Sequence, residues 1–397
     1  MSESNAPSRI VHGTTAASAR LVAFLTLCLA ACTGNLHTHD SGDGMVTVPP
    51  TDGGDLDGGG GTTDGGRDAG TAPDAGMRPD MGFPAGDVPV FLAFGHAGRT
   101  VLSCDHGATW IADRSDEPSL RCYEGGQDCD HRTNAGMDVV VTPAGFFRTL
   151  GWGPSGGVDR STDGIRWSRV QTETSWSSLL YGNGYLIGTG GWSSTRSNDG
   201  GASFEDFDTG LHTTSRSGVF YDFGGGRFLN YGDSDVVFSD DGLSWTVRRG
   251  VIPGACSGPR ETMVAGGGVA LIYGNGGICR STDGGERWSV VYDGGVVSSA
   301  LWTGTRFEAW TDGERLVSTD GASWSGTALA PRFPVGPVGR SDDGRYVAVE
   351  QAFDGYYERQ GMRTSDDGVT WTEASSFTGG HPLRKIVFTR LAACPSP

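Results

Sequence analysis

Carboxylates are the side chains in this sequence that could do chemistry, because a glycoside hydrolase uses two carboxyl groups beside the bond it cleaves. They are too abundant to indicate such a pair, since 47 Asp and Glu stand against 30 Lys and Arg. Most Asp residues lie beside Gly or Ser in short polar runs, which is typical of turns. Tyr357 stands next to Glu358, but neighbours on a strand point to opposite faces. The sequence therefore assigns no catalytic residue.

The histidines and cysteines show no metal-binding spacing. His37 and His39 lie in a polar segment, whereas His96, His131 and His212 are isolated in predicted loops. Isolated loop histidines of this kind are expected to be solvated or hydrogen-bonded. No Cys-x-x-Cys pair occurs, so a structural zinc site is not expected. We predict neither a metal nor a cofactor.

One short pattern recurs seven times: Ser, any residue, Asp, a turn containing Gly, and then an aromatic residue. Its aspartates are Asp105, Asp163, Asp199, Asp241, Asp283, Asp320 and Asp367. The serines Ser103, Ser161, Ser197, Ser239, Ser281, Ser318 and Ser365 lie 58, 36, 42, 42, 37 and 47 residues apart. This spacing is near the ~40–45 residues of a four-stranded propeller blade. In such a turn the carboxylate accepts hydrogen bonds from backbone amides, and Gly supplies a positive φ.

The strands predicted around these turns make a closed ring. Each repeat contains two apolar runs joined by a tight Gly-rich turn, then a loop, a third strand, the Asp turn and a fourth strand. Only two strands, 88–94 and 99–104, precede the first turn, and one extra strand, 383–391, follows the last repeat. The sequence therefore predicts an all-β, seven-bladed β-propeller over residues 87–397. Its C-terminal strand completes the first blade and leaves no free edge.

The repeat resembles that of the Asp-box, or BNR-repeat, propellers, which are named after bacterial neuraminidases. The resemblance covers about residues 87–391 and implies the propeller fold, with the box itself structural. Sialidases of this group carry a Phe/Tyr-Arg-Ile-Pro motif ahead of the first box, and nothing before Ser103 matches it. The nearest string, Pro331-Arg332-Phe333-Pro334, has the wrong order and follows the sixth box. The resemblance thus implies no catalytic residue here.

The N-terminus is predicted to be a targeting segment, residues 1–31. An apolar run of eleven residues, 21–31, is too short to span a bilayer but suits a signal peptide. It ends in Leu29-Ala30-Ala31-Cys32, which resembles the bacterial lipobox and implies cleavage before Cys32 and a lipid on its thiol. The alternative is an ordinary cleaved signal with an incidental cysteine. Thr33 after the cysteine favours the outer membrane, with the domain facing the periplasm or the cell surface.

Residues 32–86 are predicted to be a disordered linker. The segment after Cys32 holds mostly Gly, Asp, Thr, Pro and Ala, and such a composition cannot bury enough apolar area to offset its ordering entropy. Its Asp-Gly pairs suggest calcium, but a calcium loop needs fixed ligand spacing and usually a closing Glu. The linker contains no Glu, so we expect a spacer and no ion.

Six cysteines remain after the signal and the lipidated Cys32, and an even number in an exported protein indicates disulfides. Fifteen pairings are possible for six cysteines. We predict that Cys122 pairs with Cys129, Cys256 with Cys279, and Cys104 with Cys394.

Ligand binding is expected on the propeller face opposite the Asp turns, where the loops between second and third strands join those between blades. Aromatic residues near these strand ends could stack on sugar rings or anchor a protein, although packing between blades is the alternative. The candidates are Trp152, Trp192, Tyr231, Tyr273, Trp310 and Tyr356. The longest insertion, 111–136, is either a lid over this face or a surface loop.

These features predict a cell-envelope lipoprotein whose propeller binds a glycan, or an envelope or extracellular protein, without catalysis. The chain is expected to be a monomer that touches the membrane only through the lipid on Cys32. A net charge of −17 argues against nucleic acid and anionic lipid surfaces as partners, since both require a basic face. Two alternatives stay open: a glycoside hydrolase of sialidase-like fold, and a scaffold for assembling an envelope complex.

Overall fold

The computed structural model describes residues 86–115, 138–150, 156–172, 176–190, 194–211, 218–257, 262–351, 360–377 and 381–397. The chain divides into two compact units, and all of these residues belong to the second, Gly70–Pro397. The predicted signal peptide, Cys32 and most of the predicted linker lie outside the described residues. No helix in the described part of the chain has the length and hydropathy of a membrane span.

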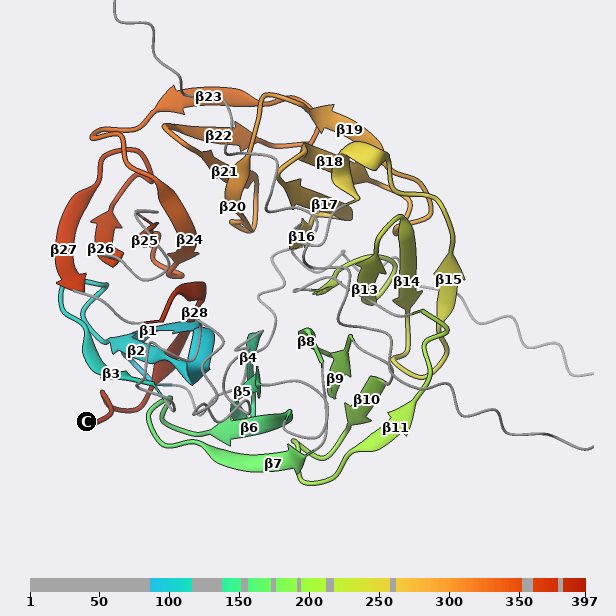
Figure 1. Ribbon diagram of the computed structural model, residues 1–397, viewed down its shortest axis with the longest axis horizontal. Helices are drawn as coiled ribbons and strands as arrows, with labels where there is room; N and C mark the ends of the chain where they lie inside the picture. The colour runs from blue at the N-terminus through green and yellow to red at the C-terminus, as the bar shows by residue number, and fades with distance from the viewer. Residues whose placement is uncertain are drawn as a thin grey trace, which may run out of the picture. The chain divides into compact units, whose positions relative to one another are not determined.

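Seven antiparallel sheets of four strands each form a ring, as the spacing of the Asp turns predicts. We call the strands of each blade A to D, from the centre of the ring to its rim (Figure 1). Blades 1 to 3 are, in that order, β28 (Leu383–Leu391), β1 (Val88–Gly95), β2 (Thr100–Ser103) and β3 (Ile111–Arg114); β4 (Val139–Thr142), β5 (Gly145–Leu150), β6 (Gly157–Ser161) and β7 (Ser168–Thr172); β8 (Ser178–Gly182), β9 (Tyr185–Thr189), β10 (Ser194–Ser197) and β11 (Glu205–Phe207).

The remaining four blades have the same A-to-D order along the chain. Blades 4 and 5 are β12 (Val219–Tyr221), β13 (Arg227–Gly232), β14 (Asp235–Ser239) and β15 (Thr246–Arg248); β16 (Thr262–Gly266), β17 (Val269–Gly274), β18 (Gly277–Ser281) and β19 (Ser289–Tyr292). Blades 6 and 7 are β20 (Val297–Trp302), β21 (Phe307–Thr311), β22 (Glu314–Ser318) and β23 (Ser325–Ala328); β24 (Val335–Arg340), β25 (Tyr346–Gln351), β26 (Gln360–Ser365) and β27 (Thr372–Phe377).

The C-terminal strand closes the ring, which confirms the prediction for residues 383–391. Strand β28 lies beside β1 in blade 1, with a register that runs from Val88 opposite Leu391 to Phe94 opposite Lys385. Strand β3 begins at Ile111, so the first four residues of the predicted 111–136 insertion belong to the fourth strand of blade 1. The insertion therefore starts later than we predicted, and residues 116–137 lie outside the described part.

The hydrophobic core consists of seven clusters of buried side chains, one at each junction between neighbouring blades of the described structure. Each blade therefore packs with both of its faces, and its middle strands are largely buried. All six residues of β5 are buried, for example, whereas all four residues of β23 at the rim are exposed. Burial on both faces explains why strands A to C lack the alternation of a half-buried sheet.

Two of the three predicted disulfides are confirmed. Cys104 is bonded to Cys394, and Cys256 to Cys279. The predicted third pair, Cys122 with Cys129, lies outside the described residues. Disulfides form and persist in oxidising compartments, so these two bonds are typical of an exported protein.

Candidate functional site

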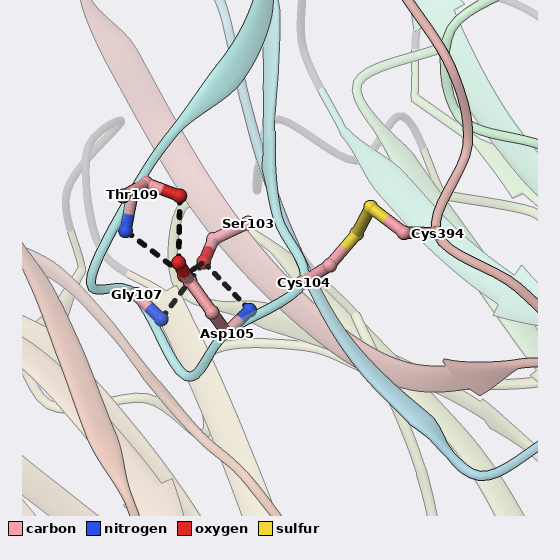
Figure 2. Close-up of a disulfide and its surroundings, with 6 residues drawn as sticks. All are labelled: Ser103, Cys104, Asp105, Gly107, Thr109 and Cys394. Carbon is pink, nitrogen blue, oxygen red and sulfur yellow. Dashed lines mark hydrogen bonds between the residues drawn. A yellow bond between two sulfur atoms is a disulfide. The ribbon is translucent and has the colours of Figure 1, made fainter.

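The two faces of the ring carry different kinds of connection. We call the face with the A–B and C–D connections the turn face, and the face with the B–C and blade-to-blade connections the loop face. On the turn face, each Ser-x-Asp turn is closed by a short hydrogen-bond circuit. In blade 1 the Ser103 hydroxyl donates to Asp105 Oδ1 at 2.8 Å and accepts from the Gly107 amide at 2.8 Å (Figure 2). Asp105 also accepts from the Thr109 amide at 2.9 Å and from its hydroxyl at 2.6 Å.

The serine-to-aspartate bond is present in all seven turns, at 2.7–3.0 Å. The carboxylates also accept amide hydrogens of their own turns, and these hydrogen bonds lower the pKa values of Asp163, Asp241, Asp320 and Asp367. Partial burial acts to raise the pKa of Asp367, but hydrogen bonds from the Thr370 and Val369 amides outweigh it and lower the pKa to about 2. Hydrogen bonds from the Ser323 and Ala322 amides likewise hold the pKa of Asp320 below its ordinary value.

This depression of the pKa predicts acid sensitivity of the fold. A carboxylate whose pKa is lower in the folded state than in the unfolded state stabilises the fold at any pH above its unfolded-state pKa. This stabilisation is lost as the pH falls through the folded-state pKa. We therefore expect the free energy of unfolding to fall between about pH 4 and about pH 2. The free energy of unfolding is measured at a series of pH values by urea unfolding, followed by tryptophan fluorescence. The variant Asp163→Asn should show a shallower decline, and a flat profile across this range would contradict the prediction.

The turns also join the blades to one another. The turn glycine Gly164 has φ +74°, and a Cβ there would lie 2.8 Å from Cδ1 of Leu92 in the preceding blade. The indole of Trp167, which follows the turn, donates from Nε1 to the Gly164 carbonyl at 3.2 Å. Similar indole bonds close the turns of Trp110, Trp288 and Trp371. The turn face is therefore a set of structural joints, and the sequence did not predict the indole bonds.

An eighth Ser-x-Asp-Gly turn, beyond the seven predicted, joins strands A and B of blade 7. The Ser341 hydroxyl donates to Asp343 Oδ1, and His106 of blade 1 lies 3.6 Å from the other carboxylate oxygen. The aromatic residue of this turn, Tyr346, comes two positions after Gly344, whereas Trp167 comes three positions after Gly164, so the spacing differs from that of the other seven turns. Its signal was the string Ser341-Asp342-Asp343-Gly344.

Three of the six aromatic candidates for ligand binding lie in the clusters between blades. Tyr231, Tyr273 and Trp310 are 0%, 9% and 0% exposed, respectively, and pack in the junctions of blades 4–5, 5–6 and 6–7. The Trp310 indole donates to the Gly368 carbonyl of blade 7 at 2.9 Å. Their positions correspond to the alternative that these aromatic residues pack between blades. A role of the three side chains in ligand binding stays a prediction. Trp152, Trp192 and Tyr356 lie outside the described residues.

Polar side chains of the loop face gather where blades 7, 1 and 2 meet. We call His96, Arg99, Asp113 and His381 the closure cluster. The imidazoles of His96 and His381 approach to 3.4 Å between their Nδ1 atoms, and both rings are buried. The Arg99 guanidinium bonds both oxygens of Asp113, at 2.8 and 2.7 Å, and donates to the His381 carbonyl at 2.8 Å. These contacts link the B–C loop of blade 1 to the segment that leads into β28.

A second polar group lies next to the closure cluster, in blade 2. Arg148 is buried, bonds the Asp159 carboxylate at 3.0 Å and reaches the Gly98 carbonyl of blade 1 at 2.7 Å. Arg169 donates to the other oxygen of Asp159 at 2.5 Å. Asp159 is thus neutralised by two guanidinium groups, and the arrangement fixes blade 2 against the first B–C loop.

Asp138 joins three blades at the inner end of the loop face. It accepts hydrogen bonds from the Val139 amide of blade 2 and the Leu179 amide of blade 3, each at 2.8 Å, and from Lys385 of blade 1 at 2.5 Å. Burial raises the pKa of Asp138, and the ammonium of Lys385 opposes that effect. Both oxygens are occupied by these donors, so Asp138 is positioned as a structural bridge.

The structure also brings together a tyrosine and a glutamate that lie far apart in the sequence. Tyr346 donates to the Glu308 carboxylate, and Glu308 is fully buried between Arg315 and Arg306. Burial and the Glu308 charge raise the pKa of Tyr346, which is the opposite of what an activated nucleophile needs. The pair is near the A–B turn of blade 6, away from the loop face.

No protein-family model and no curated protein matches the chain. Solved β-propeller structures are similar to it. A quinonprotein alcohol dehydrogenase-like protein from Bacteroides thetaiotaomicron is 12% identical with a TM-score of 0.49, over 75% of this chain and 77% of that one. YCF48 bound to a D1 peptide is 14% identical with a TM-score of 0.41, over 57% and 77%. A GH74 enzyme from Niastella koreensis is 16% identical with a TM-score of 0.42, over 62% and 44%.

Proposed function

We propose that this chain is an exported cell-envelope lipoprotein, anchored through a lipid on Cys32, whose propeller binds a glycan or a protein without catalysis. The predicted linker, residues 32–86, would hold the propeller at a distance from the membrane. Binding would use the loop face, because the turns of the opposite face are engaged in joining the blades. The recurring Ser-x-Asp circuits also support membership of the Asp-box propellers.

The observation that carries the non-catalytic assignment concerns the buried carboxylates. Among the described residues these are Asp138, Asp159 and Glu308, and each is paired with Lys or Arg. A glycoside hydrolase needs a protonated carboxyl group and a second carboxylate that face one substrate bond. Carboxylates that are each paired with a Lys or Arg side chain do not meet this requirement.

Binding and cleavage are tested together on the purified full-length lipoprotein in detergent. It is exposed to a panel of glycans and polysaccharides, and the mixtures are then analysed for cleavage products. Binding without products supports the proposal, whereas products would favour the glycoside hydrolase. If no glycan binds, a protein partner is sought by crosslinking in the native envelope, and failure there as well would contradict a binding function.

Variants then locate the binding surface. We expect Trp152→Ala and Trp192→Ala to weaken binding, because aromatic side chains at a binding face contribute much of its affinity. Leu243→Ala is the matched control, since Leu243 is 48% exposed in a turn of the opposite face. Equal affinities of all three variants would place the ligand elsewhere.

The lipid anchor has a test of its own. Cys32→Ser should remove the acyl mass from the mature chain and release the protein from the membrane fraction into the soluble fraction. An unchanged membrane association of this variant would contradict lipidation, while leaving the binding assignment to the experiments above.

A further inference from the structure

The His96 and His381 imidazoles come from segments 285 residues apart, and the backbone holds them together. His96 belongs to the short 3-10 turn η1 (His96–Gly98), directly after β1, and its amide donates to the Pro382 carbonyl at 2.9 Å. Gly95 permits this approach, because a Cβ there would lie 2.0 Å from that carbonyl oxygen. The rings are 5% and 1% exposed. The pair is therefore preorganised by the closure of the ring.

The spacing of the two nitrogen atoms matches a metal site. Zinc binds imidazole nitrogen at ~2.0–2.1 Å in tetrahedral geometry, which places two such nitrogens ~3.3–3.4 Å apart. The two Nδ1 atoms lie 3.4 Å apart, where one ring donates a hydrogen bond to the other, and the ring centroids lie 5.4 Å apart. We propose that His96 and His381 bind a divalent transition-metal ion through their Nδ1 atoms. Imidazole nitrogen suits Zn²⁺, Cu²⁺ and Ni²⁺, so the ion belongs to this class.

The surrounding charges are compatible with a cation. The nearest cationic side chain of the described cluster, Arg99, is directed to the Asp113 carboxylate and to the His381 carbonyl, so its charge is compensated. A bound ion would replace the hydrogen bond between the rings, because binding requires the tautomer of each ring that carries its proton on Nε2, and both rings then stay neutral. No group of three or more metal-binding side chains occurs among the described residues, so the ion would have two protein ligands there.

An ion bound by His96 and His381 would stabilise the closure of the ring, because of where the two residues lie. The disulfide between Cys104 and Cys394 fastens the C-terminal segment at the turn face, just after β28 ends. His381 stands just before β28 begins, at the loop face. A bound ion would fasten β28 at its other end, and it would do so reversibly.

The test is a titration of the full-length protein with Zn²⁺, Ni²⁺ and Cu²⁺, followed by calorimetry. The background variant H37A/H39A removes the two histidines of the predicted linker. In this background we expect one ion per chain, and His96→Ala or His381→Ala should weaken binding by at least about 10-fold, as loss of a supporting partner alone does at other metal sites. His106→Ala is the matched control, because His106 lies on the turn face, and it should leave the affinity unchanged.

Two measurements keep the proposal open to contradiction even if a variant fails to fold. Electron paramagnetic resonance of Cu²⁺ in the H37A/H39A background should show coupling to two imidazole nitrogens. Zn²⁺ should raise the midpoint of thermal unfolding in that background, since it binds only the folded ring. Absence of binding in the background, a copper spectrum without nitrogen coupling, or undiminished affinity in His96→Ala and His381→Ala would each overturn the site.

Discussion

Replacing Cys104 and Cys394 together by serine is expected to lower the free energy of unfolding by about 4–5 kcal/mol, because the bond closes a very long loop. The two cysteines are 290 residues apart, and a cross-link removes more entropy from the unfolded chain as its loop grows. Cys394 is exposed and Cys104 half-buried, so the replacement leaves no cavity. Urea unfolding without reductant measures the change, and Figure 2 shows how the bond adjoins the first Ser-x-Asp turn.

The second disulfide is the matched control for this prediction. Cys256 and Cys279 are 23 residues apart, so the same entropy argument gives about 3 kcal/mol for Cys256→Ala with Cys279→Ala. Both of these sulfurs are buried in the junction of blades 4 and 5, and lost packing adds to that cost. If the Cys104 and Cys394 double variant lost less than about 1 kcal/mol in its free energy of unfolding, closure of the ring by the disulfide would not stabilise the fold as we expect.

Glu308→Gln is expected to destabilise the fold by about 3–4 kcal/mol, because removing one partner of a buried ion pair leaves the other charge uncompensated. Glu308 is 0% exposed and Arg315 is 11% exposed, with a second guanidinium from Arg306 on the same carboxylate. Glutamine keeps the shape of the side chain and removes its charge. The measurement is urea unfolding at neutral pH.

An exposed pair of the same chemistry provides the control for Glu308. Arg196 and Glu205 are joined across neighbouring strands of blade 3, and Glu205 is 70% exposed. Glu205→Gln should change the free energy of unfolding by less than about 0.5 kcal/mol, since solvent screens exposed pairs. Equal effects of the two substitutions would show that burial does not govern the contribution of Glu308.

The repeat spacing was sufficient to predict the number of blades and the closing strand. A Ser-x-Asp turn with a following aromatic residue satisfies its own hydrogen bonds within a few positions, so its pattern is local and visible in the sequence. The two strands before Ser103 and the single strand at 383–391 then left one arrangement for blade 1. The structure confirms it.

The aromatic candidates show where the same reasoning lacked information. In a half-buried sheet, alternation tells which face of a strand is solvated, but strand B of each blade packs on both sides. Polar residues stand beside both candidates, Asn230 next to Tyr231 and Thr311 next to Trp310, but they mark no solvated face, because Asn230 is itself buried. Burial on both faces removes the periodic signal that would separate a core aromatic residue from one at a surface.

The residues of the closure cluster are brought together by the topology of the ring. The sequence could predict their proximity only through the predicted pairing of strands. His96 and His381 look isolated in the sequence because 285 residues separate them. His96 follows β1 and His381 precedes β28, however, and these strands pair antiparallel. The end of one antiparallel strand lies beside the start of the other, so the predicted closure already implied that these two histidines are neighbours.

The pairing of β28 with β1 also sets the order in which the molecule can fold. Of the described strands, β1 to β3 leave the ribosome before the others, although their inner neighbour β28 is synthesised after all of them. Until then β1 presents unpaired amides and carbonyls, the kind of edge at which chains join one another wrongly. Completion of the ring is thus a late step of high contact order, which makes it slow. A nascent chain interrupted before Leu383 would keep six complete blades and an open edge prone to aggregation.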